Sequence, residues 1–272
     1  MIPTIKTSPA LFAALTATAL LVFQPSMASA RTTLQLDNGN VLSFSDGSID
    51  MVSGSGELFD VSVVEYGEEV ARAEYVRIDA TGNLGQADWF VNELVADNLE
   101  AAEEGIFIGR AELRDIAMGM LAIDDEMVDY EQYLTPGTSV LLENIGMADE
   151  EALFSVDRVA SLPFSFDLLN DGQQIVTNAG IEVDGFTMMP LDGSAAGSDP
   201  MLQNLAERGI TDVGMDLKIA SSVRLAGDSM TVFYGIEAAM RDLTEIRFNV
   251  ALSMAQVSYS QLVPMLSSPE AN

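Results

Sequence analysis

The sequence predicts a mainly β protein: a curved antiparallel sheet of repeated hairpins with one or two short helices. Three observations support this fold class, namely turn dipeptides between short apolar segments, sustained alternation of apolar and polar residues, and a weak internal repeat. The chain has 272 residues, of which 48% are hydrophobic, so it can bury a core despite its strong negative charge.

Turn dipeptides mark the first hairpins. Asn38-Gly39 stands between the apolar residues Leu36 and Val41, and a type I′ turn favours this pair. The stretch 57–78 interleaves apolar residues with charges and is predicted to form two strands with one solvated face. Comparable turn pairs beside β-branched or aromatic residues are Asp46-Gly47, Asp171-Gly172, Asp192-Gly193 and Gly227-Asp228.

The C-terminal third has the most regular alternation. Apolar residues recur at every second position over 213–219, 230–236 and 246–252, with polar or small residues between them. Because a strand turns successive side chains to opposite sides, this pattern predicts three strands that share one apolar face.

Two segments have helical spacing. Residues 200–208 begin with Pro200 and are followed by Gly209, and residues 124–134 carry acids near their start. The segment 89–99 is ambiguous, since it fits a helix that aligns Phe90, Leu94 and Asn98. We favour a strand there, with a core position for Trp89 rather than a partner contact. The inward residues of that strand would be Trp89, Val91, Val95 and Leu99.

The middle of the chain contains a weak internal sequence repeat. The unit beginning at Asn98, with a strand, an acidic turn and a second strand carrying Arg110, matches a unit that begins at Asn144 and carries Arg158. A frayed third copy is expected at Asn178. Repetition of one hairpin unit predicts an elongated, curved sheet.

These repeated units, together with segments 210–217, 231–234, 242–250 and 257–259, resemble repetitive β-sheet envelope proteins of Gram-negative bacteria, the AsmA- and TamB-like group. The resemblance covers residues 70 to 260 and is one of rhythm, without a diagnostic motif. It implies a curved sheet that cradles lipid acyl chains or supports the envelope. The membrane anchor typical of that group has no counterpart in the expected mature chain, which argues against a bridge between membranes.

The first 30 residues are predicted to be a secretion signal, with Lys6, an apolar run and the small residues Ala28-Ser29-Ala30. Its removal takes Lys6 and no acid, so 12 basic residues become 11 against 42 acidic ones and the net charge changes from −30 to −31. Residues 31–272 are then expected to form a single elongated β-rich domain, with a possible subdivision near 190–200. We expect a periplasmic or secreted location.

Composition excludes several functions. The chain has no His and no Cys, which removes His-dependent triads, thiolate sites and disulfides. The negative charge disfavours nucleic acid, and no second apolar run is long enough for a membrane-spanning helix. No carboxylate pair stands out among so many acids, and Lys218 lacks a serine three positions before it. We therefore expect neither an enzyme nor a cofactor.

The acidic clusters are expected to form a solvated surface rather than a calcium site, because none has the spacing of a calcium-binding loop. They are Glu68-Glu69, Glu103-Glu104, Asp124-Asp125-Glu126 and Asp149-Glu150-Glu151.

The candidate site is an apolar groove on the C-terminal strands, lined by Met215, Leu217, Val232 and Phe248. Methionines here are either an adaptable lining for acyl chains or ordinary core, and the sequence leaves both readings open. A lipid or another apolar molecule is the expected ligand. The alternative is a structural protein that pairs with an envelope partner through its sheet edges.

Overall fold

The computed structural model describes residues 21–22, 31–36, 40–50, 52–83, 88–101, 105–117, 134–148, 152–170, 172, 174–190, 212–241 and 244–255. These residues form one antiparallel sheet of fifteen strands, which confirms the predicted fold class of a mainly β chain. The strands are β1 (Leu21–Val22), β2 (Thr32–Leu36), β3 (Val41–Phe44), β4 (Asp46–Ile49), β5 (Gly56–Glu65), β6 (Glu68–Thr81), β7 (Phe90–Ala101), β8 (Ile106–Ala117), β9 (Leu134–Ala148), β10 (Ala152–Ser161), β11 (Ser165–Leu168), β12 (Gln174–Pro190), β13 (Val213–Ala226), β14 (Ser229–Met240) and β15 (Thr244–Ala255).

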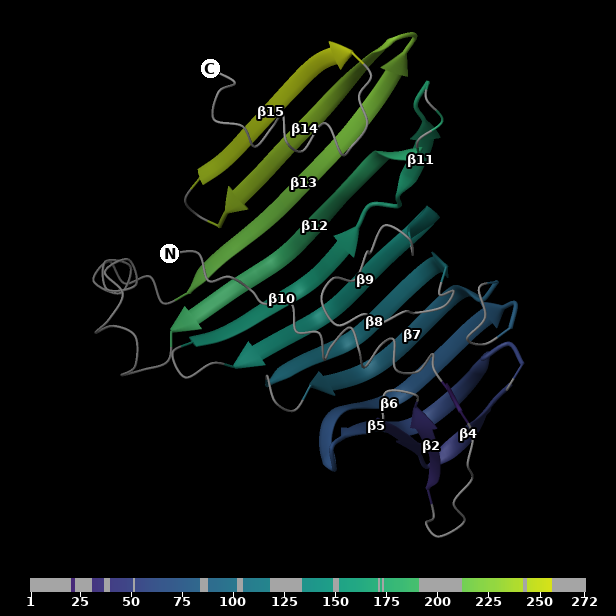
Figure 1. Cartoon of the computed structure of the whole chain (residues 1–272). Coiled ribbons are helices and arrows are strands. Elements are labelled where there is room, and N and C mark those ends of the chain that lie inside the picture. Colours follow the sequence, from purple (N-terminus) through teal and green to yellow (C-terminus); the bar gives the residue numbers. More distant parts are fainter. Residues whose placement is uncertain are drawn as a thin grey trace.

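The sheet is a meander in which each strand pairs with its neighbour in sequence (Figure 1). Two short strands complete the pattern: β4 follows β3 along β5, and β11 follows β10 along β12. β12 and β13 pair directly, so the sheet continues across the sequence region near 190–200. β1 falls within the predicted signal segment and joins the sheet through two residue pairs with β2.

Antiparallel strands pair on either side of several predicted turns. Leu34 pairs with Leu42, so β2 and β3 form the predicted hairpin, but Asn38-Gly39 and Asp192-Gly193 themselves lie outside the described part. Gly227 and Asp228 join β13 to β14 as a two-residue turn, and β11 and β12 pair on either side of Asp171-Gly172.

One predicted turn is wrong. Asp46 and Gly47 lie inside β4, where they pair with Phe59 and Leu58. The chain reverses instead between β4 and β5, where the backbone N–H of Gly54 donates to the carbonyl oxygen of Asp50. Gly47 serves a close approach: a Cβ there would lie 2.1 Å from the carbonyl oxygen of Glu57. Both helical segments predicted from sequence, 200–208 and nearly all of 124–134, lie outside the described residues.

The β5–β6 turn provides a stability test. Tyr66 and Gly67 form a two-residue turn with φ of 50° and 93°, and Tyr66 is 97% exposed. Asparagine adopts this left-handed conformation at lower cost than tyrosine. Tyr66→Asn is therefore expected to raise the free energy of unfolding by about 0.5 kcal/mol, measured by urea denaturation, and Tyr66→Val to lower it. A stabilising valine would contradict the assigned turn.

A row of backbone irregularities crosses the middle of the sheet. Alternate strands carry a residue with positive φ at this level: Asp60 at 50°, Asn98 at 53°, Asn144 at 55° and Gly185 at 66°. The registers of the intervening strands place the residues Glu74, Gly109, Asp157 and Asp216 beside them.

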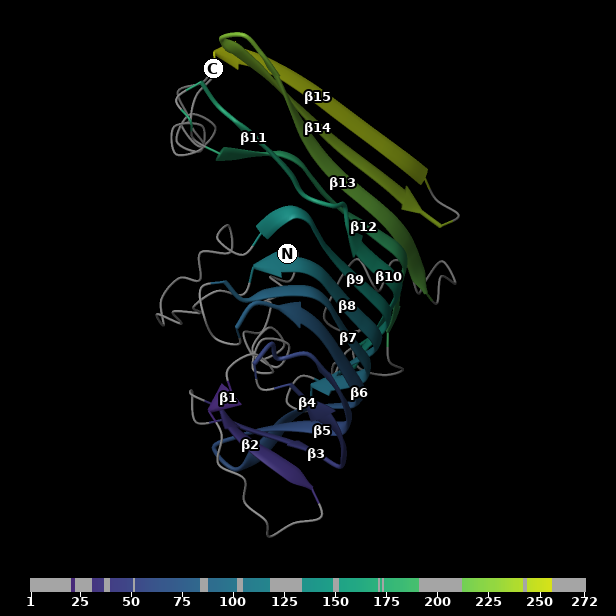
Figure 2. The ribbon, with the colours of Figure 1, turned by 90° about the vertical axis from the view of Figure 1, so that its right-hand side faces the viewer.

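Side-chain hydrogen bonds stabilise this row at two of its positions. The Asn98 amide donates to Glu74 at 2.7 Å, and the backbone N–H of Gly185 donates to Asp216 at 2.7 Å. Bulges bend a strand and increase its twist, so a row of them bends the whole sheet along one line. The strands bow accordingly (Figure 2). Asn98 and Asn144 are equivalent in the predicted repeat, whereas the third copy differs, since β12 carries the irregularity at Gly185 rather than Asn178.

The core lies on one face of the N-terminal strands, which curl around it (Figure 2). Trp89 is 2% exposed within this core and donates its ring N–H to the carbonyl oxygen of Ser53 at 2.8 Å, so the predicted core role is confirmed. The prediction that the Val95 side chain points into this core is wrong. Val95 is buried on the opposite face between Arg77 and Glu112, because irregular positions at Asn92 and Asn98 shift the alternation and turn Leu94 and Ala96 inward.

Candidate functional site: the open part of the apolar face

The face that carries the core continues to the C-terminal end of the sheet. In an antiparallel pair, residues directly opposite each other project from the same face. One line of opposite pairs therefore joins the edge of the core, at Leu142, to the last strand. The line consists of Leu142, Val159, Val183, Leu217, Ala238 and Ile246. We call this side the apolar face and the other side the polar face.

All four residues predicted to line a groove lie on the apolar face. Met215 and Leu217 project from β13, Val232 from β14 and Phe248 from β15. They lie at different levels along the strands: Leu217 is opposite Ala238, whereas Val232 is opposite Leu252. The structure thus gathers them on one surface rather than in one contact.

Among the described side chains of β13, β14 and β15, no charged one occupies the apolar face. The same strands carry six charged residues on the polar face. On the apolar face β13 contributes Val213, Met215, Leu217, Ile219, Ser221, Val223 and Leu225, β14 contributes Met230, Val232, Tyr234, Ile236, Ala238 and Met240, and β15 contributes Thr244, Ile246, Phe248, Val250, Leu252 and Met254.

Exposure divides the apolar face into two parts. In the N-terminal half Ile108 is 1% exposed, whereas on β15 Ile246 is 57%, Phe248 52% and Leu252 45% exposed. The N-terminal core is tightly packed: the space lined by Leu42, Val63 and Leu94 measures about 20 Å³, room for a single water. We call the apolar-face residues of β13–β15 the open face. Those whose burial is described are half-buried or exposed, apart from Met230 at 2%.

Methionines and aromatic rings extend the open face toward β10. Met215 lies opposite Met240, and Met230 lies opposite Met254. Next to Met215, the ring of Phe186 lies 6.3 Å from that of Phe154. Sequence reasoning did not single out these two rings or Ile246 as site residues. The alternation around Ile246 was a sufficient signal, but Phe154 and Phe186 share a face through a bulged register that the sequence does not reveal.

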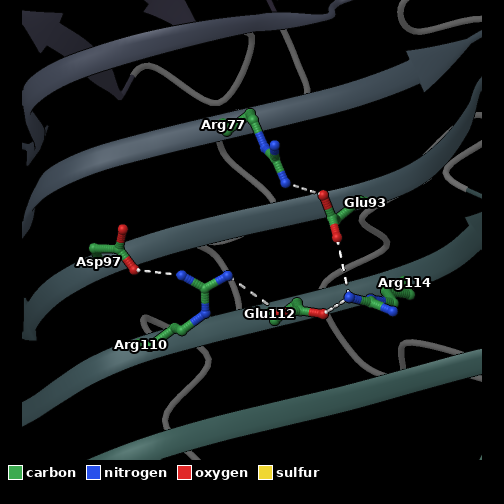
Figure 3. A network of polar contacts seen from close by, with 6 residues as sticks. All are labelled: Arg77, Glu93, Asp97, Arg110, Glu112 and Arg114. Carbon is green, nitrogen blue, oxygen red and sulfur yellow. Dashed lines mark hydrogen bonds and ion pairs between the residues drawn. The ribbon is translucent and has the colours of Figure 1, made fainter.

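The polar face of β6, β7 and β8 is held by a chain of ion pairs (Figure 3). Glu93 joins Arg77 to Arg114, and Arg114 in turn contacts the buried side chain of Glu112. Arg110 connects Glu112, at 3.4 Å, to Asp97. Most of these groups are substantially exposed, so each pair contributes at most about 1 kcal/mol. Their alternating signs keep this face solvated and free of repulsion.

The polar face of β12–β15 is predominantly acidic. A depression of about 250 Å³ there is lined by five carboxylates around Lys218, whose hydrogen bond to Glu182 raises the pKa of the ammonium group. Asp216 accepts the Gly185 N–H. The five carboxylates that line the depression are Glu182, Asp184, Asp216, Glu237 and Glu245. Among the described residues no group of carboxylates has the geometry to hold a metal ion.

Searches against protein-family models, curated proteins and solved structures give no match, so the site is assigned from its own geometry. Within the described residues, no helix has the length and apolar character needed to span a bilayer.

Proposed function

We propose that this protein is a non-catalytic envelope protein, periplasmic or secreted, that binds the acyl chains of a lipid on its open face. The single observation that carries the proposal is an uncharged apolar surface, most exposed along β15, on a chain of net charge −30. Water would otherwise cover this surface at a cost of about 25 cal/mol for each Å² of apolar area.

The size of the open face supports a ligand role. It spans three strands of 12 to 14 residues. At about 3.4 Å per residue and about 4.8 Å per strand, it measures roughly 40 by 14 Å. The resulting area of about 550 Å² is at the upper end of the largest apolar patch on a typical monomer, and such patches commonly mark binding sites.

The chemistry of the open face favours chains over headgroups. Among the side chains that the structure describes there, the polar groups are the hydroxyls of Ser221 and Tyr234, so dispersion and burial supply the binding energy. The methionine pairs add flexible, polarisable side chains that suit ligands of varied shape. Because the chain is strongly acidic, a neutral or zwitterionic headgroup is favoured over an anionic one.

The envelope location rests on the predicted signal segment and on the resemblance to Gram-negative envelope proteins. Expression of the full chain in a Gram-negative host tests this location. The periplasmic fraction should contain a product whose measured intact mass equals that of the chain from Arg31 to Asn272. A cytoplasmic product that retains Met1 would contradict this location.

Charging the open face tests lipid binding. Phe248→Glu is expected to weaken binding of a fluorescent fatty-acid analogue in zwitterionic micelles by at least 10-fold, because a carboxylate on this surface must stay hydrated. The matched control is Ala251→Glu, which adds the same charge to an exposed position of β15 on the polar face. Equal loss of binding in both variants, or in neither, would contradict a site on the open face.

The second candidate function is pairing with an envelope protein through a sheet edge. One observation favours it: β15 is the last strand of the sheet and pairs within the described residues with β14 alone.

A further inference from the structure

β15 is a regular edge strand that lacks the usual features that prevent pairing with another chain. Its pairing with β14 runs from Thr244 to Ala255 without a register shift. Exposed edges are normally protected from other chains by proline, lysine, bulges or a short length. β15 has twelve residues and contains no proline, glycine or lysine. Within the described part of the chain this edge has no further partner strand, and it therefore offers an uninterrupted row of backbone donors and acceptors.

The charge of this edge is balanced. Its only two charged residues, Glu245 and Arg247, form an ion pair with each other at 2.5 Å. In a chain of net charge −30, the described sheet thus ends in a strand that carries no net charge. Repulsion between two molecules is smallest where such neutral edges meet.

The side-chain pattern of β15 is self-complementary. Consider two antiparallel copies of β15 related by a two-fold axis that passes between the two copies of one residue. Every residue then lies opposite a residue of the second copy that projects from the same face of the sheet. An axis through Asn249 places Ile246 opposite Leu252 of the second copy and Phe248 opposite Val250 of the second copy. An axis one residue further, through Val250, also sets apolar against apolar, and both registers use nearly the whole strand.

We propose that β15 pairs antiparallel with β15 of a second copy, centred on Asn249 or Val250, so that two open faces join into one continuous apolar surface. A two-fold pairing satisfies both edges with the same contacts and places the exposed side chains of Ile246, Phe248 and Leu252 beside apolar side chains of the second copy. This dimer does not depend on lipid binding, because it uses the backbone edge rather than the face.

Cysteine cross-linking tests the dimer cleanly, because the natural chain has no cysteine. The two copies of the residue at the axis lie opposite each other with their Cα atoms about 4.5–5.5 Å apart, which is within reach of a disulfide. Mild oxidation is expected to yield a disulfide dimer for Asn249→Cys or for Val250→Cys. The matched control is Ser253→Cys, an exposed position on β15 whose copies lie more than about 20 Å apart in both registers. Equal cross-linking of all three variants, or of none, would overturn the proposal.

Sedimentation of the unmodified protein gives an independent readout. The dimer is expected to strengthen with salt, since screening removes the repulsion between two strongly negative molecules. Arg247→Glu gives the edge two negative charges and is expected to weaken the dimer at least 10-fold at low salt, without change in the far-UV circular dichroism spectrum. A monomer at every salt concentration up to about 1 mM protein would contradict the dimer. Lipid binding by such a monomer would leave the proposed function intact.

Discussion

Replacing Ile108 by alanine is expected to lower the free energy of unfolding by about 2–5 kcal/mol, whereas the same change at Ile246 should cost less than about 1 kcal/mol. Both isoleucines lie on the apolar face, so residue type and side of the sheet are matched. They differ in environment: Ile108 is 1% exposed inside the closed core and Ile246 is 57% exposed on the open face.

The physical reason is the cavity that a truncation leaves. At Ile108 the neighbours cannot collapse into the space of the lost side chain, so the chain loses both burial and packing contacts. At Ile246 water already covers much of the side chain. The measurement is urea unfolding followed by the fluorescence of Trp89, the single tryptophan, which lies in the same core as Ile108.

A similar cost at the two positions would show that another part of the chain covers Ile246. That result would remove the surface on which the proposed lipid site depends. A small cost at Ile108 would instead mean that the N-terminal strands do not enclose a packed core.

Replacing Gly185 by alanine is expected to lower the free energy of unfolding by about 1–3 kcal/mol. Gly185 has a φ of +66°, which a residue with a Cβ adopts at a cost. A Cβ there would also lie 2.1 Å from the Asp157 carboxylate and 2.8 Å from the Asp157 Cβ. The change thus strains the row of irregularities that bends the sheet.

Gly146 is the matched control, because it lies in β9 with ordinary φ and open space around the position of a Cβ. Gly146→Ala is expected to be neutral or slightly stabilising, since alanine restricts the unfolded chain. Chemical denaturation of both variants gives the comparison. Equal stability of Gly185→Ala and the natural chain would contradict a bulge that requires glycine.

The hairpins could be predicted because their causes are local. Gly227 needs only its own left-handed conformation and the alternating residues beside it to position the β13–β14 turn. The row of irregularities was not predicted, because Asp60, Asn98 and Asn144 stand in strand-like stretches where an Asp or Asn equally fits an ordinary solvent-facing position. Val95 shows the consequence: two irregular positions in β7 reverse its direction, and strict alternation could not foresee them.

The candidate site could be predicted in part. Alternation alone placed Met215, Leu217, Val232 and Phe248 on one face, because regular strands without bulges preserve the period of two. Whether that face is open depends on where the sheet stops curling over its own core, which is a long-range property of all the strands. The contrast between Ile108 and Ile246 is visible only in the folded chain.

The proposed lipid site is tested most directly by native mass spectrometry of the protein purified from the periplasm of a Gram-negative host under mild conditions, followed by extraction of bound lipid. We expect a stoichiometric adduct of a neutral or zwitterionic lipid with the natural chain and with Ala251→Glu, and its loss in Phe248→Glu. A ligand-free protein that also gains no adduct from added phosphatidylethanolamine or fatty acid would contradict lipid binding on the open face.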